Sequence, residues 1–300
     1  MNTNAAAAVL NPATLRGRAA AYFELTKPRV VTMILITALA GFYMGCRTEF
    51  NFELALKLLC GTALAAGGTL ALNQYLERDY DAIMRRTLTR PLPSGRLQPN
   101  EALVFGIVIG LAGIVFLYTE VNPLSALVTS LITILYLGAY TPMKRITWLC
   151  HLVGGIPGAL PPVIGWAAAR DSLGAEAFVL FGIMLLWQLP HSLSIARIYQ
   201  SEYAQAGLSL LPMDRPGGNP VNVLMITATA LLVGFGTLPT LMGFAGQFYL
   251  AVALSFGLWM LYQAVRLVWG DQTHTAARHV MMVSLVYLPV VLMMMVLDKI

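Results

Sequence analysis

Residues 58–81, LLCGTALAAGGTLALNQYLERDYD, begin as an apolar segment and end as a polar one. The first part, Leu58–Leu72, has the composition of a membrane-spanning helix. In the second part the oxygen-bearing side chains of Asn73, Glu77 and Asp81 recur at every fourth residue. On an α-helix each step of four residues drifts by only about 40°, so these three side chains form one stripe. The segment predicts a membrane helix that carries a polar stripe at one membrane face.

The composition of the whole chain is typical of a membrane protein. Its 300 residues are 58% hydrophobic and only 11% charged, and their mean hydropathy is +0.71. Soluble domains carry roughly 25% charged residues and cannot bury this much apolar surface in one core. The three cysteines are scattered and form no CxxC pair, which argues against a disulfide framework or a thiolate metal site. These features exclude a soluble enzyme, a disordered protein and a secreted disulfide scaffold.

Apolar runs of helical length recur along the chain, and none shows the alternation of a membrane β-strand. We predict an all-α, polytopic bundle of about nine transmembrane helices. It forms a single domain over residues 25–300, after a flexible cytoplasmic tail over residues 1–24. The nine runs are Val30–Cys46, Leu58–Leu72, Ala102–Thr119, Leu124–Ala139, Ile146–Ala169, Ala177–Ala196, Val221–Leu241, Phe244–Val265 and Val280–Leu297.

Basic residues are distributed unevenly between the two sides of this bundle. With the N-terminus in the cytoplasm, 15 of the 19 lysines and arginines fall on the cytoplasmic side, as the positive-inside rule requires. The exceptions are Arg47, Lys57, Arg170 and Lys299. The net charge of +5 therefore indicates membrane topology, and no nucleic-acid partner is expected. The N-terminal segment resembles neither a cleavable signal peptide nor a long transit peptide, so we expect a bacterial inner membrane.

The chemistry of the polar stripe points to a metal ion. Two carboxylates on one stripe repel each other unless a cation lies between them, and Mg²⁺ prefers hard oxygen ligands that it shares with substrate phosphates. Arg85, Arg86, Arg90 and Arg96 follow directly, and arginine binds phosphate oxygens in a bidentate manner. The pattern indicates a Mg²⁺–diphosphate site near the cytoplasmic face. A solvated helix end, followed by arginines that only set topology, is the alternative.

Further motifs are spread from about Leu25 to Asp298. They are LTKPRV at residues 25–30, YTPMKR at 140–145, GALPPVIGW at 158–166, WQLPH at 187–191 and YAQAG at 203–207. Together with the stripe and the M-x-R-T-x2-R-P-L-P run at residues 84–93, they are similar to the signatures of the UbiA-type intramembrane prenyltransferases. The W-Q-x-P-H motif resembles the branch of that family that farnesylates protohaem IX, rather than the branches that act on quinone precursors.

This resemblance implies transfer of the farnesyl group of farnesyl diphosphate to a vinyl group of haem b, with Mg²⁺ as cofactor. The implied catalytic residues are Asn73, Glu77, Asp81 and His191. The implied diphosphate ligands are Lys27, Arg29, Arg86, Arg90, Lys144 and Arg145. The implied haem contacts are Trp187, Gln188 and His191, and the implied metal ligands are Asn73, Glu77, Asp81 and Glu202. His191 is compatible with iron ligation, contact with a haem propionate, orientation of haem, proton transfer, or a purely structural hydrogen bond between helices.

Three positions depart from the family pattern. Glu77 stands where Asp is usual, Glu202 lies where an aspartate pair is usual, and Ser192 follows the histidine in place of Phe. Glutamate keeps the charge and the oxygen ligands but extends the carboxylate by about 1 Å, and Mg²⁺ demands near-ideal octahedral geometry. The two glutamates are therefore expected to affect the affinity for the metal.

Two features are expected to serve the fold alone. Gly154, Gly155 and Gly158 favour close packing between helices. Pro161 and Pro162 are expected to break the fifth span, because proline lacks the N–H that continues an α-helix.

Two other functions are compatible with parts of the pattern. A UbiA-type enzyme that prenylates an aromatic or quinone precursor would carry the same stripe and differ in its acceptor site. A non-catalytic transporter of haem or lipid would place polar residues through the membrane depth on several spans, whereas here they gather at one face. The sequence leaves open the oligomeric state, the route of haem entry and the docking of a downstream haem-modifying enzyme.

Overall fold

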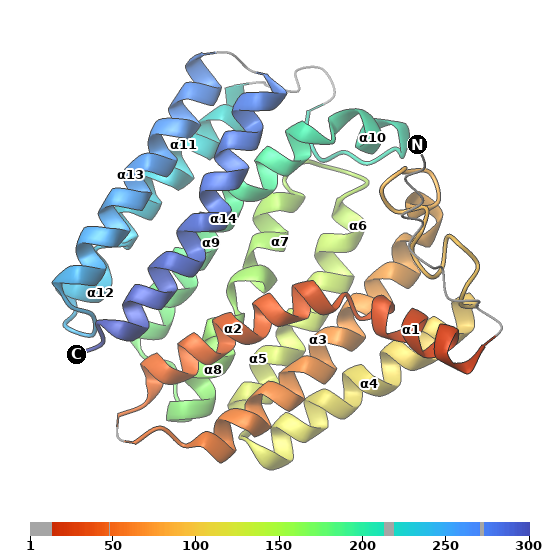
Figure 1. Cartoon of the computed structure of the whole chain (residues 1–300), viewed down its shortest axis with the longest axis horizontal. Helices are drawn as coiled ribbons and strands as arrows, with labels where there is room; N and C mark the ends of the chain where they lie inside the picture. Colours follow the sequence, from red (N-terminus) through yellow and green to blue (C-terminus); the bar gives the residue numbers. More distant parts are fainter. Residues whose placement is uncertain (1–13, 48, 213–218, 271–272) are drawn as a thin grey trace, which may run out of the picture.

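The computed structural model describes residues 14–47, 49–212, 219–270 and 273–300, and over these ranges the chain is a bundle of helices (Figure 1). In chain order the elements are α1 (Leu15–Leu25), α2 (Pro28–Gly45), α3 (Phe52–Asp81), α4 (Pro99–Glu120), α5 (Pro123–Ile134), the π-helix η1 (Leu135–Tyr140), α6 (Thr141–Met143), α7 (Cys150–Ala159), α8 (Pro161–Arg170), α9 (Ala175–Ile198), α10 (Gln200–Gln205), α11 (Asn219–Phe235), α12 (Leu238–Leu241), α13 (Gln247–Trp269) and α14 (His274–Leu297).

Within the described ranges, nine helical segments are long and apolar enough to cross a membrane. The predicted number and order of spans are thereby confirmed, with boundaries that differ by a few residues. Three spans are composite: α5, η1 and α6 form the fourth, α7 and α8 the fifth, and α11 and α12 the seventh. The second helix is longer than its apolar run at both ends: it begins at Phe52 and, as the stripe predicts, continues without a break to Asp81.

The segment expected to be a flexible tail contains a helix, α1. Its N-terminus is capped by Thr14, whose hydroxyl oxygen accepts a hydrogen bond from Gly17 N at 3.1 Å. Its buried face packs in an apolar cluster with residues of α3 and α4. A good cap and an apolar partner surface together stabilise a short helix that would be marginal alone. Residues 15–24 of this segment are thus helical, while residues 1–13 lie outside the described part of the chain.

The outer surface of the bundle is apolar at helical spacing. On α4, Val104, Val108, Leu111 and Val115 are each at least 58% exposed. Steps of four, three and four residues place them on one face of the helix. A continuous exposed apolar face is expected for a helix that contacts lipid, and it would be unstable in water.

Proline residues divide two of the spans. The fifth span breaks as predicted, since α7 ends at Ala159 and α8 begins at Pro161. In the fourth span Pro142 cannot donate a backbone hydrogen bond, and its ring disfavours regular α-helix before it. There the helix widens into η1, and the Thr141 N–H and hydroxyl both donate to the Tyr136 carbonyl five residues earlier. Such π-helical turns are frequent at functional sites.

Glycines permit the closest helix crossings. Where α2 meets α8, a Cβ at Gly41 would lie 2.0 Å from Pro162 O, and a Cβ at Gly165 would lie 1.8 Å from Ala38 O. The backbones of the two helices are therefore in direct contact. Between α7 and α9, a Cβ at Gly158 would lie 2.2 Å from the side-chain oxygen of Gln188. The predicted packing role of the α7 glycines is confirmed.

The two ends of the bundle differ in character. One end, which we call the polar end, carries the segment 82–98, α6 and α10 (Figure 1). At the opposite end the C-terminal residues are tied to α2, since Lys299 Nζ donates to the carbonyl oxygens of Tyr43 at 2.6 Å and Cys46 at 2.7 Å. These contacts fix the C-terminus against α2 at the end that lies away from the acidic stripe.

Candidate active site

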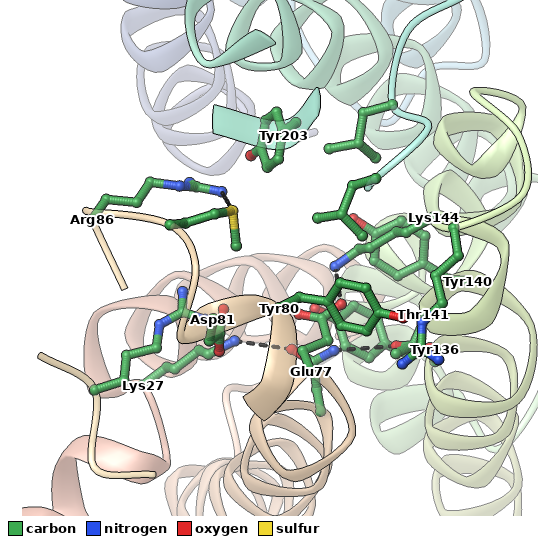
Figure 2. A pocket seen from close by; sticks show the side chains of 16 residues that line it. Lys27, Glu77, Tyr80, Asp81, Arg86, Tyr136, Tyr140, Thr141, Lys144 and Tyr203 are labelled. Atoms are coloured by element: carbon green, nitrogen blue, oxygen red, sulfur yellow. Dashed lines mark hydrogen bonds and ion pairs between the residues drawn. The ribbon is translucent and has the colours of Figure 1, made fainter. Parts of the chain in front are cut away.

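A cavity of about 120 Å³ lies at the polar end. Its wall is built from the last turns of α3, the segment 82–98, the η1–α6 turn, and α10 with the residues after it. Figure 2 shows these parts approaching one another from different sides, with Lys144 and Tyr140 opposite Lys27 and Arg86. The charged side chains of the wall are Lys27, Arg86, Arg90, Lys144, Arg145, Glu77 and Asp81. Five cations outnumber two carboxylates, so the cavity favours a polyanion.

All three members of the predicted stripe line this cavity, and Asn73 and Asp81 are each only 1% exposed. Each of the three is in contact with a basic side chain. Lys27 Nζ donates to Asn73 Oδ1 at 3.0 Å, Lys144 Nζ to Glu77 Oε1 at 2.6 Å, and Arg90 to Asp81 Oδ2 at 2.6 Å. These contacts join four separate parts of the chain around the stripe.

Backbone geometry brings two of these partners into place. Lys27 connects α1 to α2 with a φ of 51°, a left-handed conformation that is uncommon outside glycine and that recurs at functional sites. The tight connection lets its side chain reach α3. On the other side, the Asn73 amide donates to Thr141 Oγ at 3.1 Å, and Thr141 is held by the π-helical turn. Asn73 is thereby fixed between two elements that are distant in sequence.

The two lysines of the cavity have opposite electrostatic environments. Burial, together with the nearby Arg90 guanidinium, lowers the pKa of Lys27 to about 7. Burial alone would also lower the pKa of Lys144, but Tyr140 and Glu77 overcome it and hold that pKa well above the usual value. Lys144 is therefore fully charged at neutral pH, whereas a polyanion in the cavity would favour the charged form of Lys27.

The arginines expected to bind diphosphate divide into two groups. Arg86, Arg90 and Arg145 line the cavity. The Arg86 guanidinium lies over the ring of Tyr203, 4.7 Å from its centroid, and that of Arg145 lies 4.3 Å from the centroid of Tyr80. Arg29 is not part of this wall. It lines a second, apolar chamber instead, because α2 begins at Pro28 and directs the next residue away from Lys27.

The apolar chamber, of about 550 Å³, lies beside the cavity within the bundle. Tyr136 lines both spaces and therefore marks their junction. Met33 and Ile36 of α2 and Leu285 of α14 line the chamber although each is about half exposed. The chamber thus opens sideways between α2 and α14, toward the region that lipid occupies around a membrane protein. Its size is typical of a pocket for a small organic ligand.

His191 and Trp187 lie in this chamber, away from the acidic stripe. Their rings are stacked, with centroids 5.1 Å apart, and both side chains are anchored to Ser284 of α14. Trp187 Nε1 donates to Ser284 O at 2.7 Å, and His191 Nδ1 lies 2.8 Å from Ser284 Oγ. The Ser284 hydroxyl itself donates to Met281 O. His191 Nδ1 must therefore be the donor to Ser284, which leaves Nε2 without a proton.

The third expected haem contact, Gln188, points elsewhere. Its amide donates to Gly155 O, so the side chain fills the interface between α7 and α9, and it is not among the residues that line the chamber. On α9, residues 187 and 191 share one face because they are four apart, whereas 188 is rotated by about 100°. Gln188 therefore serves helix packing.

Glu202, the fourth expected metal ligand, is not among the residues that line the cavity. It lies on α10 next to Tyr203, and it is Tyr203 that turns its side chain to the wall. The Oε2 atom of Glu202 is buried and has no hydrogen-bond partner among the described residues. In the described ranges no cluster of three or more His, Cys, Asp and Glu side chains could hold a metal ion by itself.

The remaining stripe still has the donor chemistry that Mg²⁺ requires. It offers two carboxylates and one amide oxygen, all hard oxygen ligands, in a cavity that also has room for a polyanion. Mg²⁺ typically takes one or two carboxylates from the protein and completes its coordination with substrate phosphates and water. The residues present therefore fit a Mg²⁺ ion that is shared with a phosphate-bearing ligand.

Several residues of the site were not predicted from the sequence. Tyr136 and Thr141 lie five apart in the fourth span, a spacing that only the π-helical turn places on one side. Leu208 and Leu210 complete the cavity wall from the segment after α10. Ser284, which orients His191, lies in an apolar span where a serine is usually a packing residue. The pair of tyrosines at residues 136 and 140 is the sequence signal from which this part of the site could have been predicted.

Comparison with known proteins places this architecture in a family. Residues 34–286 match the UbiA prenyltransferase family, and the chain therefore belongs to that family of membrane-embedded prenyltransferases. It is 43% identical to the protoheme IX farnesyltransferase of Solibacter usitatus, over 93% of this chain and 98% of that one. The resemblance described above is confirmed.

Solved structures share the fold at low sequence identity. A structure of digeranylgeranylglyceryl phosphate synthase matches with a TM-score of 0.80 at 17% identity, covering 94% of this chain and 98% of that chain. A UbiA homologue from Archaeoglobus fulgidus, bound to DMAPP and Mg²⁺, matches with a TM-score of 0.66 at 16% identity, covering 91% and 99%. The predicted fold class is thereby confirmed.

Proposed function

We propose that this protein transfers the farnesyl group of farnesyl diphosphate to a vinyl group of haem b. The products are haem O and diphosphate, and one water is added to the former vinyl group. The observation that carries the proposal is a cationic cavity with an acidic stripe, joined at Tyr136 to an apolar chamber that contains His191. The relatives that are named protoheme IX farnesyltransferase support the choice of acceptor.

The two spaces suit the two halves of farnesyl diphosphate. The diphosphate carries several negative charges, which match the excess of basic side chains in the cavity. The C15 chain is apolar and suits the chamber, whose wall is formed mostly by aliphatic side chains. Tyr136, at the junction, would then lie beside the allylic carbon where the C–O bond breaks. Haem b is also amphipathic and would enter the chamber from the bilayer, through the opening between α2 and α14.

The side chains of the cavity would promote departure of diphosphate. As the allylic C–O bond breaks, negative charge grows on the diphosphate oxygens, and Lys144, Arg86 and Arg90 lie where they can stabilise it. Asn73, Glu77 and Asp81 would hold Mg²⁺, which when bound supplies further positive charge to the leaving group. The apolar chamber keeps water from the allylic cation until the haem vinyl group attacks it.

A direct assay tests this function. The purified protein is incubated in detergent or lipid with haem b, farnesyl diphosphate and Mg²⁺, and the haems are extracted and separated by chromatography. We expect haem O to accumulate together with diphosphate. Absence of haem O would contradict the proposal. A prenylated aromatic product, formed when a quinone precursor replaces haem b, would favour the other branch of the family.

Glu77→Asp is expected to retain or raise activity, because aspartate keeps the charge and both oxygen ligands of this member of the stripe. The shorter side chain lengthens the contact between the carboxylate and Lys144 Nζ, which is now 2.6 Å, by about 1 Å. Because the charge and the oxygen ligands are kept, the rate should stay within roughly threefold of the wild type. Haem O formation at several Mg²⁺ concentrations measures the effect. Glu77→Gln, which loses the charge, is the matched comparison and should lose about 10²-fold. Complete loss in Glu77→Asp would show that the longer arm is required here.

His191 is proposed to bind the haem iron through the unprotonated Nε2, since Nδ1 is committed to Ser284. Neutral imidazole is a common axial ligand of haem. We expect His191→Ala to remove the spectral shift that ferric haem shows on binding, and to raise the apparent KM for haem b about tenfold. The KM for farnesyl diphosphate should change little. An unaltered haem spectrum in this variant would rule out iron ligation.

The protein is a multi-pass membrane protein, and we propose the inner membrane of a bacterium as its location, with the N-terminus and the polar end in the cytoplasm. The uneven distribution of basic residues supports this orientation. Cysteine accessibility at an introduced site in the segment 82–98 tests it: a membrane-impermeant thiol reagent should label this site only after the cells are opened.

A further inference from the structure

His151 is a buried histidine that lines neither the cavity nor the chamber. It lies in the first turn of α7, with Nε2 3.0 Å from Leu210 O and Nδ1 3.1 Å from Ser192 Oγ. A carbonyl oxygen can only accept, so Nε2 carries the proton. The Ser192 hydroxyl is within reach of Nδ1 and also of Leu189 O. Because the Ser192 hydroxyl has this second partner, the hydrogen bond from His151 to Leu210 O is the better defined of the two.

This hydrogen bond reaches a part of the wall that closes the diphosphate cavity. Leu208 and Leu210 line the cavity, and both are buried. Between them, Ser209 N donates to Lys144 O at 2.7 Å. The segment is further held by Leu208 N, which donates to Tyr203 O at 2.9 Å, and by Ser209 Oγ, which donates to Arg145 O at 3.3 Å. Among these contacts, only the one from His151 reaches Leu210 itself and comes from α7.

We propose that His151 is a positioning residue that keeps Leu208 and Leu210 against the cavity and so excludes water from the allylic cation. The proposal rests on the proposed function, because it assumes that an allylic diphosphate reacts there. Ser192, one of the departures from the family pattern, lies beside the imidazole on α9. Leucine side chains over the cavity present no group that could capture a cation, whereas water would.

The chemical consequence of a loosened wall is hydrolysis in place of transfer. Water attacks C1 of the farnesyl group, the C–O bond to diphosphate breaks, and farnesol, diphosphate and one proton are formed. The amount of farnesol released per haem O therefore reports how well the wall excludes water. A residue with a purely structural role would lower both products together and leave this ratio unchanged.

Two polar replacements separate the contacts of the two imidazole nitrogens. In His151→Gln the side-chain amide nitrogen takes the place of Nε2 and can still donate to Leu210 O. In His151→Asn the amide nitrogen takes the place of Nδ1 and reaches only Ser192. We expect His151→Asn to raise the ratio of farnesol to haem O roughly five- to tenfold, the equivalent of one net hydrogen bond. His151→Gln should stay within about twofold of the wild type.

Ser194→Ala is a matched control. Ser194 is buried, like His151, but it lies on α9, and its hydroxyl donates only within that helix, to Pro190 O. Hydrogen exchange of a peptide covering residues 206–212 provides a readout that does not need turnover, and it should be faster in His151→Asn than in His151→Gln. Equal product ratios and equal exchange in the two variants would overturn the proposal. Failure of the wild type to form haem O would instead refute the function on which it rests.

Discussion

Asp81→Asn should lower the rate of haem O formation by on the order of 10³-fold. Asp81 is the most enclosed carboxylate of the cavity, only 1% exposed, and it accepts a hydrogen bond from Arg90 at 2.6 Å. Asparagine keeps the shape of the side chain but removes a negative charge and one oxygen ligand of the proposed Mg²⁺. Turnover at increasing Mg²⁺ concentrations, with saturating haem b and farnesyl diphosphate, measures the loss.

The control for this variant is Asp79→Asn. Asp79 belongs to the same helical turn, carries the same charge and has a side chain that is 79% exposed, so we expect nearly wild-type turnover. Because removal of one partner of a buried ion pair can cost about 3–5 kcal/mol, the thermal unfolding of both variants must be compared. A folded Asp81→Asn protein that retains more than a tenth of the wild-type rate would contradict the assignment of Asp81 as a metal ligand.

Lys144→Gln should lower turnover by about 10²-fold, because it removes the lysine that stays fully charged in the cavity. The Lys144 ammonium lies 2.6 Å from Glu77 Oε1 and 4.4 Å from the centroid of the Tyr140 ring. Since the missing charge would act on the leaving diphosphate, we expect kcat to fall more than the apparent KM for farnesyl diphosphate rises. Steady-state kinetics with both substrates varied separates these effects.

Lys57→Gln is the matched control for Lys144. Lys57 forms ion pairs with Glu53 and Glu120 on the surface near the other end of α3, so its removal should leave kcat unchanged. A Lys144→Gln enzyme with normal kcat and a raised KM would show that Lys144 contributes only to binding. A variant with wild-type values for both constants would remove Lys144 from the proposed mechanism.

The features that depend only on residues close together in the sequence were predicted correctly. The nine spans depend on runs of apolar residues of membrane length, and the stripe of Asn73, Glu77 and Asp81 depends only on helical periodicity. The break at Pro161 has an equally local cause. In each case the backbone within about two turns contains the whole reason, so neighbouring residues suffice to predict the result.

The positions of several candidate residues depend on how the helices are rotated and packed against each other. Gln188 and Glu202 lie in motifs that were correctly found, yet one fills the interface between α7 and α9 and the other lies off the cavity wall. Arg29 reaches the chamber and not the cavity. A sequence motif shows which side chains occur together, but it does not show whether each of them faces the cavity, the chamber or a helix interface.

Periodicity and hydropathy were enough to place an acidic stripe at the end of one membrane helix and to indicate a metal-assisted reaction there. The arrangement of five basic side chains around that stripe, the junction at Tyr136 and the unprotonated nitrogen of His191 arise only in the folded bundle. The physical reason is the range of the interactions. Helix formation is decided by neighbours in the chain, whereas cavities are decided by packing and hydrogen bonds between residues as far apart as Lys27 and Asn73 or His191 and Ser284.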